Sequence, residues 1–363
     1  MRAILVAPPA KGARLGDAPT PTLGPGQVRV RTLECGICGT DRDIASGLYG
    51  QTPPGRADLV LGHENLGRVL ETGSGVVDFA AGDLVVATVR RGCGRCRFCR
   101  ANRSDFCETG EFTERGIRGR DGYLADEYVE EPEYLVRVPK RLRSVAVLLE
   151  PLSVVEKAVE QGQALLARLK APAGPAPPPP AALIAGTGAI GILAAFRLRL
   201  AGFEVTAIDR HGDDTPAGRL LATIGAHHVN AASGLDALGP AKFELIVEAS
   251  GSASLDFDLL QRLGPNGALV LTGIPSADRP PFLVAGGGLL RDVVLENQAL
   301  VGSVNANRTY FALGLRHLAQ FRRRWGEAVG GVVTERRPLE EFAAVLTAPT
   351  TGAMKSVLVV HPE

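Results

Sequence analysis

The sequence lacks the features of a membrane protein and of a nucleic-acid-binding protein. Its longest uncharged apolar stretch, from Ala181 to Phe196, is too short and too rich in glycine to cross a bilayer. Its 40 Lys and Arg residues nearly balance its 39 Asp and Glu residues, so no global field attracts nucleic acid or an acidic membrane. The first residues contain no apolar run typical of a signal peptide. We therefore expect a cytoplasmic protein without nucleic-acid or membrane partners.

Cysteine is absent from the last two-thirds of the chain. All six cysteines lie between Cys35 and Cys107, and only one of the six histidines, His63, precedes residue 210. In a cytosolic protein, clustered cysteines indicate metal binding more than disulfides. We therefore expect metal sites in the N-terminal third of the chain.

The pattern of apolar residues divides the chain into two textures. The length of 363 residues predicts about two domains of roughly 150 residues each. The N-terminal part has short β-branched runs punctuated by Gly and Pro, and a similar strand texture returns after a helix at 309–325. Between them, strands and helices alternate as in a parallel, doubly wound sheet. We predict an α/β fold with a β-rich domain at 1–179 and 308–363 and a parallel-sheet domain at 180–307.

A proline-rich stretch precedes the parallel-sheet region. Six prolines fall between Pro172 and Pro180, after a helix expected at 148–169. Such a stretch cannot be helical, so we interpret it as an extended surface connection or local insertion, and no function can be assigned to it.

A glycine turn predicts a dinucleotide site. The GxGxxG string follows a strand, opens a helix and precedes a second strand that ends in Asp209. Glycines in this context allow close approach of the backbone to a pyrophosphate at the helix N-terminus. The expected cofactor-binding residues of this turn are Gly186, Thr187, Gly188, Ala189, Ile190 and Gly191.

Asp209 bears on the choice of nicotinamide cofactor. Its carboxylate can accept hydrogen bonds from ribose hydroxyls and repels a 2′-phosphate, so NAD is favoured. Arg210 and His211 follow at once and could instead accommodate the phosphate of NADP, although a solvated loop is an equal interpretation of these two residues.

Four closely spaced cysteines predict a structural zinc site. Cys93, Cys96, Cys99 and Cys107 can supply a closed tetrahedral set of thiolates, which would fix a loop too small for its own core. An iron–sulfur cluster is the less favoured alternative. Six arginines lie among or beside them and either offset the charge of the thiolates or form a solvated basic face: Arg90, Arg91, Arg95, Arg97, Arg100 and Arg103.

A second, catalytic zinc is expected from scattered ligands. Cys38 in CGICGTD and His63 in LGHENLG supply a thiolate and an imidazole, and a catalytic zinc needs three protein ligands with one open position. Glu150 is the best third candidate, because it lies in an apolar context where an unpaired carboxylate is costly. Helix capping is its alternative role.

Two neighbours of these ligands keep alternative interpretations. Glu64 is either an alternate ligand, a group close to the metal, or half of a structural ion pair. Cys35 lies three residues before Cys38, and a redox CxxC pair is a further, less favoured possibility.

Together these motifs resemble the zinc-containing medium-chain alcohol dehydrogenases over essentially the whole chain. CGICGTD, GHE, the four cysteines and the GxGxxG turn occur in the same order as in that family. Several longer strings are similar to its glucose 1-dehydrogenase branch: RRGCGRCRFC, DFCETGEFTERGI, DGYLADEYV, EPLSVVEKA and VGSVNANRTYF. The resemblance implies a GroES-like β-rich catalytic domain, a Rossmann nucleotide-binding domain, and commonly a homo-oligomer, either dimer or tetramer.

The resemblance also implies roles for individual residues. In that branch the catalytic zinc is held by residues matching Cys38, His63 and Glu150, with Glu64 close to the metal. The residue matching Thr40 lies beside nicotinamide and substrate. The residue matching Glu114 hydrogen-bonds sugar hydroxyls, and the one matching Asn305 lies near substrate and cofactor.

The implied reaction is oxidation of an aldopyranose at C1 to the lactone, with hydride transfer to NAD or NADP. The sequence departs from some sugar dehydrogenases at two positions, where it has Val89 in place of Asn and Val154 in place of an acidic residue. Because these changes remove potential partners of sugar hydroxyls, the identity of the sugar stays open. The alternatives are a zinc dehydrogenase of another polyol, a secondary alcohol or threonine, a zinc-free quinone or enone reductase, and a non-catalytic nucleotide-binding protein.

Overall fold

The computed structural model describes residues 1–168, 178–275, 281–347 and 352–362. Positions 172–177 of the proline-rich stretch therefore lie outside the described residues. The chain forms two compact units. Unit 1 comprises Met1–Ser153, Asn305–Ala319 and Val333–Glu363, and unit 2 comprises Val154–Val304 and Gln320–Val332. Whether 1–179 with 308–363, and 180–307, fold as separate domains stays a prediction.

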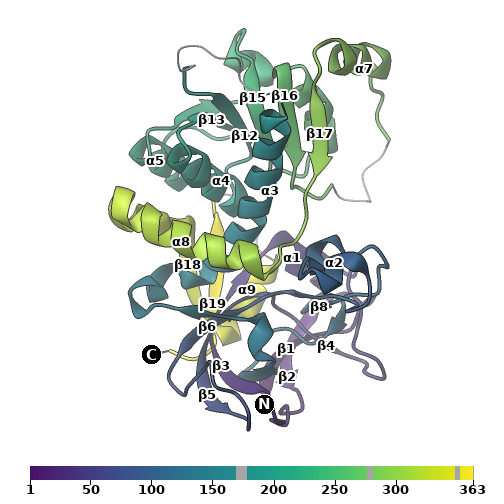
Figure 1. Cartoon of the computed structure of the whole chain (residues 1–363), viewed down its shortest axis with the longest axis vertical. Helices are drawn as coiled ribbons and strands as arrows, with labels where there is room; N and C mark the ends of the chain where they lie inside the picture. Colours follow the sequence, from purple (N-terminus) through teal and green to yellow (C-terminus); the bar gives the residue numbers. More distant parts are fainter. Residues whose placement is uncertain (169–177, 276–280, 348–351, 363) are drawn as a thin grey trace. The chain divides into compact units, whose positions relative to one another are not determined.

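Unit 1 is rich in short strands (Figure 1). In the described part of unit 1 the strands are β1 (Arg2–Val6), β2 (Ala13–Asp17), β3 (Val28–Ile37), β4 (Leu59–Val60), β5 (Glu64–Thr72), β6 (Leu84–Ala87), β7 (Arg90–Arg91), β8 (Thr113–Arg115), β9 (Gly119–Arg120), β10 (Glu127–Glu130), β11 (Leu135–Val138), β18 (Val333–Pro338) and β19 (Lys355–Val359). Its helices include α1 (Gly39–Ala45), α2 (Arg97–Arg100) and α9 (Phe342–Thr347).

The main sheet of unit 1 joins both ends of the chain. Its strand order is β11-β6-β5-β3-β19-β18, with β10 also paired to β3. Because β19 pairs antiparallel with β3, the C-terminal Ser356 lies opposite Ile37, one residue before Cys38. Val, Ile and Leu side chains of these strands fill a buried core. The β-branched residues among them, Val and Ile, favour strands because they fit a pleated, half-buried surface. The sheet therefore holds β3 and β5, whose ends carry Cys38 and Glu64, in fixed register.

Unit 2 contains a parallel sheet. Its strands are β12 (Ala181–Ala185), β13 (Glu204–Asp209), β14 (His227–Asn230), β15 (Phe243–Glu248), β16 (Leu263–Leu271) and β17 (Ala299–Gly302). The helices between them are α4 (Ala189–Leu200), α5 (Pro216–Thr223), α6 (Ala253–Leu260) and α7 (Gly286–Leu295). Two longer helices, α3 (Leu149–Ala167) and α8 (Arg308–Trp325), contribute residues to both units.

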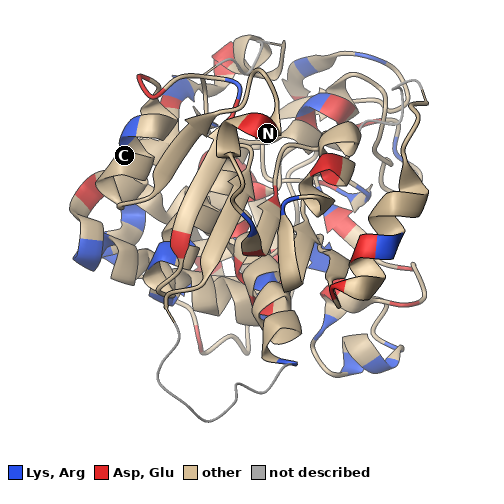
Figure 2. Ribbon diagram, turned by 90° about the horizontal axis from the view of Figure 1, so that it is seen from above, with Lys and Arg blue, Asp and Glu red and all other residues tan. Residues whose placement is uncertain are grey.

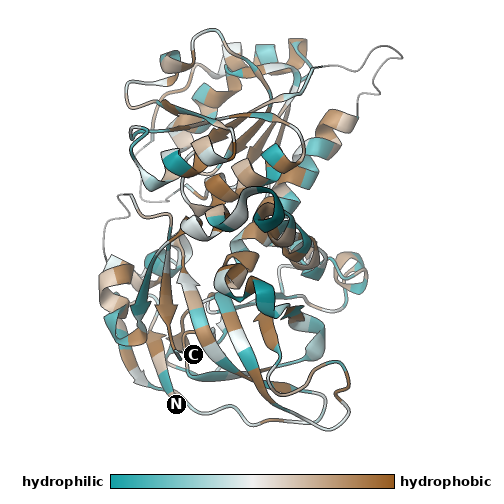
Figure 3. Ribbon diagram, turned by 90° about the vertical axis from the view of Figure 1, so that its left-hand side faces the viewer, coloured by the Kyte–Doolittle hydropathy of each residue, from teal (hydrophilic) through white to brown (hydrophobic). Residues whose placement is uncertain are grey.

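The strand order of unit 2 indicates where in its sheet a ligand is expected to bind. The order is β14-β13-β12-β15-β16-β17, and every neighbouring pair is parallel. This is the doubly wound order whose direction reverses beside β12, the switch point where such sheets bind ligands. The central strands are almost wholly buried and appear brown in Figure 3, as expected for a parallel sheet covered on both faces. The predicted α/β class is confirmed.

Local differences from prediction follow from short-range sequence. The helix that the GxGxxG string was expected to open begins only at Ala189, because the first three residues of the string form the glycine turn. Helix α7 and edge strand β17 were not predicted from the sequence. Gly286, Gly287 and Gly288 open that helix, and glycine is a poor helix former.

The distribution of charged residues and the hydropathy of the helices are those expected from the balanced charge of the sequence and its lack of long apolar runs. Acidic and basic residues are interspersed along the ribbon in Figure 2. Among the described residues, no helix is long and apolar enough to cross a membrane.

Candidate functional site

Cys38 lies at the junction of β3 and α1. It is the N-cap of α1, and its Sγ accepts a hydrogen bond from the backbone N–H of Thr40 at 3.2 Å. Its own N–H donates to Oδ2 of Asp41 at 2.9 Å, which completes a capping box. The cap thus fixes the thiol at the end of a buried strand.

His63 lies next to this thiol. Its Nε2 is 3.0 Å from Sγ of Cys38, and its Nδ1 is 3.3 Å from Oδ1 of the fully buried Asp41. Burial lowers the pKa of His63, but Cys38 and Asp41 outweigh that effect and raise it well above its usual value. A carboxylate behind an imidazole is the arrangement that orients a metal-binding histidine.

Glu64 completes a compact group of donors. Its Oε1 accepts a hydrogen bond from Nζ of the buried Lys355 at 2.5 Å, whereas its buried Oε2 has no partner among the described residues. A Cβ on Gly36 would lie 2.1 Å from that Oε2, so only glycine leaves room for the carboxylate. Glu64 therefore forms an ion pair with Lys355 through one oxygen and also lies in the donor group with Cys38 and His63.

Glu150 stands slightly apart from the other donors. The ligand atoms of Cys38, His63 and Glu64 lie within 4.8 Å of one another, and Glu150 is outside that group. Its side chain is buried, and burial raises its pKa to about 7; His63 lowers the pKa and Glu64 raises it. His63 and Glu64 are thus close enough to influence the pKa of Glu150, and among the described residues its carboxylate accepts no capping hydrogen bond.

The donor set fits zinc. One thiolate, one imidazole and a carboxylate with an unpartnered buried oxygen are the ligands of catalytic zinc sites. Cys35, in contrast, is fully buried in the core of unit 1, and burial raises the pKa of its thiol well above the usual value. That environment makes a thiol inert and disfavours the redox interpretation.

The four-cysteine lobe, residues 93–107, brings its thiols together. The Sγ atoms of Cys93, Cys96, Cys99 and Cys107 lie within 4.8 Å of one another. Backbone N–H groups donate to two of them, from Cys96 to Cys93 and from Cys99 to Cys96, each at 3.4 Å. The four-thiolate set fits a closed zinc site.

The arginines around this lobe divide into two kinds. Arg95 and Arg97 are exposed and pair with Glu111 and Glu108, as expected for a solvated basic face. Arg90 and Arg91 are buried, so that interpretation is wrong for them. Tight packing explains the difference, because both guanidinium groups lie over aromatic rings and bind carboxylates inside the unit.

Glu114 and Asn305 lie in contact within unit 1. Nδ2 of Asn305 donates to Oε1 of Glu114 at 2.6 Å. Asn305 has a φ of 59°, a left-handed conformation that asparagine tolerates better than most residues. The two residues expected to orient the substrate are therefore brought together.

The glycine turn has the tight geometry that a pyrophosphate site needs. A Cβ on Gly191 would lie 1.8 Å from the carbonyl oxygen of Gly186, so a larger residue would force the turn apart. Gly188 is the N-cap of α4, which begins at Ala189. The backbone N–H groups at the start of α4 lie beyond the end of β12, where an anion binds favourably.

Asp209 is embedded in hydrogen bonds at the end of β13. Thr187 donates its hydroxyl hydrogen to it, the N–H of His211 donates at 2.7 Å, and Nε2 of His228 lies 3.2 Å away. Burial raises the pKa of Asp209, but these bonds outweigh it and lower the pKa. Asp209 is therefore ionised at neutral pH, while Arg210 is exposed.

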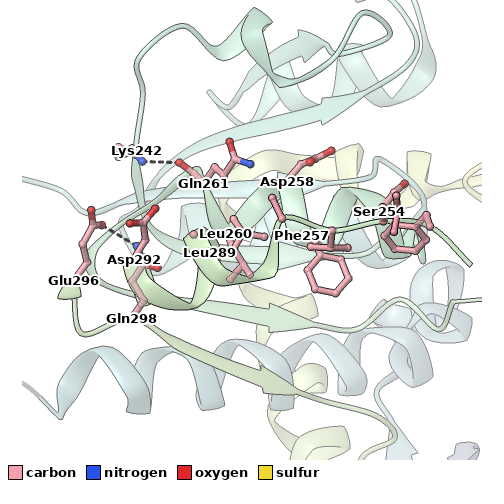
Figure 4. Close-up of a pocket in the computed structure, with 15 residues that line it drawn as sticks. Lys242, Ser254, Phe257, Asp258, Leu260, Gln261, Leu289, Asp292, Glu296 and Gln298 are labelled. Atoms are coloured by element: carbon pink, nitrogen blue, oxygen red, sulfur yellow. Dashed lines mark hydrogen bonds between the residues drawn. The ribbon is translucent and has the colours of Figure 1, made fainter. Parts of the chain in front are cut away.

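One cavity of unit 2 lies apart from all of these residues. It has a volume of about 580 Å³ and is lined by side chains from α6 and α7, including Phe257, Leu289 and Asp292 (Figure 4). None of the residues predicted from the sequence lines it.

The comparisons with known proteins agree along the whole chain. The family model "Alcohol dehydrogenase GroES-like domain" matches residues 24–140, and "Glucose dehydrogenase C-terminus" matches residues 143–360. A glucose 1-dehydrogenase of Methanocella arvoryzae is 39% identical over 94% of each chain. Glucose 1-dehydrogenase 1 of Caldivirga maquilingensis is 40% identical over 100% of this chain and 99% of its own. The chain belongs to the glucose dehydrogenase branch of the zinc medium-chain dehydrogenases.

A solved structure of this branch has the same fold. Haloferax mediterranei glucose dehydrogenase, in complex with NADP, Zn and gluconolactone, covers 100% of both chains with a TM-score of 0.88 and 29% identity. The predictions of family, of a GroES-like and Rossmann fold, and of a nicotinamide-linked zinc dehydrogenase are confirmed.

Sequence reasoning about this zinc dehydrogenase missed four residues near its site. Asp41 lies behind His63, Lys355 pairs with Glu64, Arg90 pairs with Glu114, and His228 contacts Asp209. Only Asp41 had a local signal, because an acidic residue three positions after Cys38 is typical of a capping box. The others find their partners at 19 or more positions along the chain.

Proposed function

We propose that this chain oxidises an aldopyranose at C1 to the lactone and passes the hydride to C4 of a nicotinamide cofactor. The observation that carries the proposal is the group formed by half-buried Cys38 with buried His63 and Glu64, whose second carboxylate oxygen has no partner among the described residues. The chain that carries this group is 39% identical to a glucose 1-dehydrogenase. Two zinc ions are proposed per chain, one catalytic and one in the four-cysteine lobe.

The proposed catalytic ligands are Cys38, His63 and Glu150, with Glu64 as an alternate ligand. A zinc ion bound there supplies Lewis acidity that lowers the pKa of the C1 hydroxyl. Asp41 orients the imidazole of His63, and Lys355 holds one oxygen of Glu64. Thr40 or Glu64 relays the hydroxyl proton towards solvent, while Glu114 and Asn305 orient the sugar.

NAD is the favoured cofactor in this proposal. Asp209 is ionised, so its negative charge opposes a ribose 2′-phosphate, although Arg210 nearby is exposed.

The experiment is a comparison of initial rates. Aldoses, polyols and secondary alcohols are each tested with NAD and with NADP, and lactone formation is followed. We expect the highest kcat/KM on an aldose. Higher values on a polyol or a simple alcohol would overturn the sugar assignment and leave the dehydrogenase class standing.

We also propose that the chain is a homo-oligomer. Helix α7 buries no residue, and large apolar side chains on α7 and the edge strand β17 are exposed in the single chain, among them Leu290, Val294 and Leu300. An edge strand beside an apolar surface offers backbone and side chains to an identical strand across a two-fold axis.

A further inference from the structure

Arg90 makes a buried ion pair with Glu114. The two residues lie directly opposite each other in the antiparallel pair β7 and β8. Their exposed fractions are only 8% and 5%. Removing two charges from water carries a considerable desolvation cost, which their mutual attraction often only offsets, so a buried ion pair adds little net stability. The pair therefore calls for an explanation beyond stability.

The hydrogen bonds to Glu114 fall on one oxygen only. Nε of Arg90 donates to Oε1 at 2.9 Å, and its second terminal nitrogen lies 2.9 Å from the same atom. Nδ2 of Asn305 reaches Oε1 as well, at 2.6 Å. Within the described part of the chain, Oε2 accepts no hydrogen bond. Because each carboxylate oxygen accepts about two hydrogen bonds, Oε1 is saturated and the acceptor capacity that remains is on Oε2.

Arg90 is itself held by the four-cysteine lobe. Its remaining terminal nitrogen donates to the backbone oxygen of Asp105 at 3.1 Å, and its guanidinium lies 3.8 Å from the centre of the Phe112 ring. Asp105 lies between Cys99 and Cys107 in the lobe. The position of the guanidinium thus depends on the folded lobe.

The same lobe also holds the segment that carries Asn305. Nδ2 of Asn307 donates to Oδ1 of Asp105 at 2.9 Å, and Oδ1 of Asn307 accepts from the N–H of Thr309 at 2.8 Å, at the start of α8. Asp105 therefore binds Arg90 directly on one side of the Glu114 carboxylate, and on the other side it binds Asn307, two residues after Asn305.

We propose that Arg90 is a positioning residue for sugar recognition: with Asn305 it holds Oε1 of Glu114, so that Oε2 is presented to a substrate hydroxyl. The four-cysteine lobe supports the arrangement through Asp105. This inference rests on the proposed function, and it gives the lobe a part in substrate selectivity. A polyhydroxylated substrate gains from a fixed acceptor, whereas an alcohol without a second hydroxyl gains nothing from it.

The test compares Arg90→Met and Arg90→Lys with Arg118→Met. Arg118 also lies over Phe112, 4.8 Å from the ring centre, and is a matched control because none of its side-chain nitrogens contacts Glu114. We expect Arg90→Met to raise the KM for the best aldose about 10- to 100-fold, as expected for loss of a charged hydrogen bond. The kcat, the KM for cofactor and the kcat/KM for a simple secondary alcohol should stay within about threefold. Arg90→Lys should recover part of the sugar KM, and Arg118→Met should behave as wild type.

A double variant separates positioning from general damage. Because Arg90 acts through Glu114, Arg90→Met combined with Glu114→Gln should raise the sugar KM no further than Glu114→Gln alone. Independent, multiplying effects would overturn the proposal. So would an unchanged sugar KM in both Arg90 variants, or an equal loss on sugar, simple alcohol and cofactor together with loss of zinc from the lobe.

Wild-type activity on aldoses separates failure of the proposed function from failure of the role proposed for Arg90. A wild-type enzyme that oxidises no aldose would overturn the proposed function and this inference together. A wild-type enzyme active on aldoses, with Arg90 variants that match Arg118→Met, would overturn the inference alone.

Discussion

At the scale of residues, the proposed catalytic zinc site depends on Cys38. Its Sγ lies 3.0 Å from His63 and is fixed by the cap of α1, so it has the position of a metal ligand. We predict that Cys38→Ala lowers kcat by about 10³-fold or more, since a Lewis-acid metal supplies several kcal/mol to the transition state. Titration of NADH fluorescence should show that cofactor binding is retained.

Cys35 provides the matched control for this prediction. Cys35→Ala removes a buried thiol three residues away that lies outside the donor group of Cys38, His63 and Glu64. It should leave kcat within a few-fold of wild type. Turnover that survives Cys38→Ala, or that disappears equally in Cys35→Ala, would argue against the ligand assignment.

Asp209 governs a second prediction at this scale. Asp209→Asn removes the charge that opposes a 2′-phosphate while keeping most of the hydrogen-bonding shape. We expect the ratio of kcat/KM with NADP to that with NAD to rise about tenfold, which corresponds to about 1.4 kcal/mol. Steady-state kinetics with both cofactors measure the ratio. An unchanged ratio would mean that Asp209 does not discriminate between the 2′-hydroxyl of NAD and the 2′-phosphate of NADP.

At the scale of elements, local sequence patterns succeeded where one segment determines the outcome. The glycine turn with β12 and α4, and the four cysteines, depend on residues within a few turns of chain, and both have the expected arrangement. Arg90 and Lys355 could not be predicted to be buried, because burial depends on partners in other elements. The spacing of 291 residues between Lys355 and Glu64 carries no periodic signal.

A buried network links the strands of unit 1. Glu130 of β10 is fully buried and accepts hydrogen bonds from Arg91 of β7 at 2.5 Å and from Arg115 of β8 at 2.9 Å. Burial raises the pKa of Glu130, but Arg115 and Arg91 outweigh it and lower the pKa to about 2. Compared with an unfolded value near 4.5, this difference corresponds to roughly 3 kcal/mol of stability.

The network predicts a dependence of stability on pH. Because the pKa is lower in the folded state, the stabilisation is present above about pH 4.5 and is lost as the pH falls towards about 2. Glu130→Gln should lower the free energy of unfolding at pH 7 by about 3–5 kcal/mol, since it leaves two buried arginines without their carboxylate. It should also flatten the acid limb of the stability profile, measured by urea unfolding.

An exposed pair of the same type serves as the control. Glu71 pairs with Arg29 at 2.7 Å but its side chain is 57% exposed. Glu71→Gln should change stability by no more than about 1 kcal/mol, as for most surface ion pairs. Equal effects of the two substitutions would show that the buried network contributes nothing special.

At the scale of the whole molecule, the exposed apolar surface of α7 and β17 predicts self-association. Leu300 on β17 is 52% exposed and Val294 on α7 is 74% exposed. Leu300→Arg combined with Val294→Glu should shift the mass measured by light scattering from a dimer or tetramer towards the monomer. Val77 in unit 1, 89% exposed, is the control, and Val77→Arg should leave the mass unchanged. A monomeric wild type, or an interface formed only with another protein, would contradict the proposal.

The most direct test of the whole account is the zinc content of the purified chain, measured by atomic emission alongside turnover. The account predicts two zinc ions per chain in the wild type, and one per chain with no appreciable turnover in Cys38→Ala. One zinc or none in an active wild-type enzyme, or two zinc ions retained in Cys38→Ala, would contradict it.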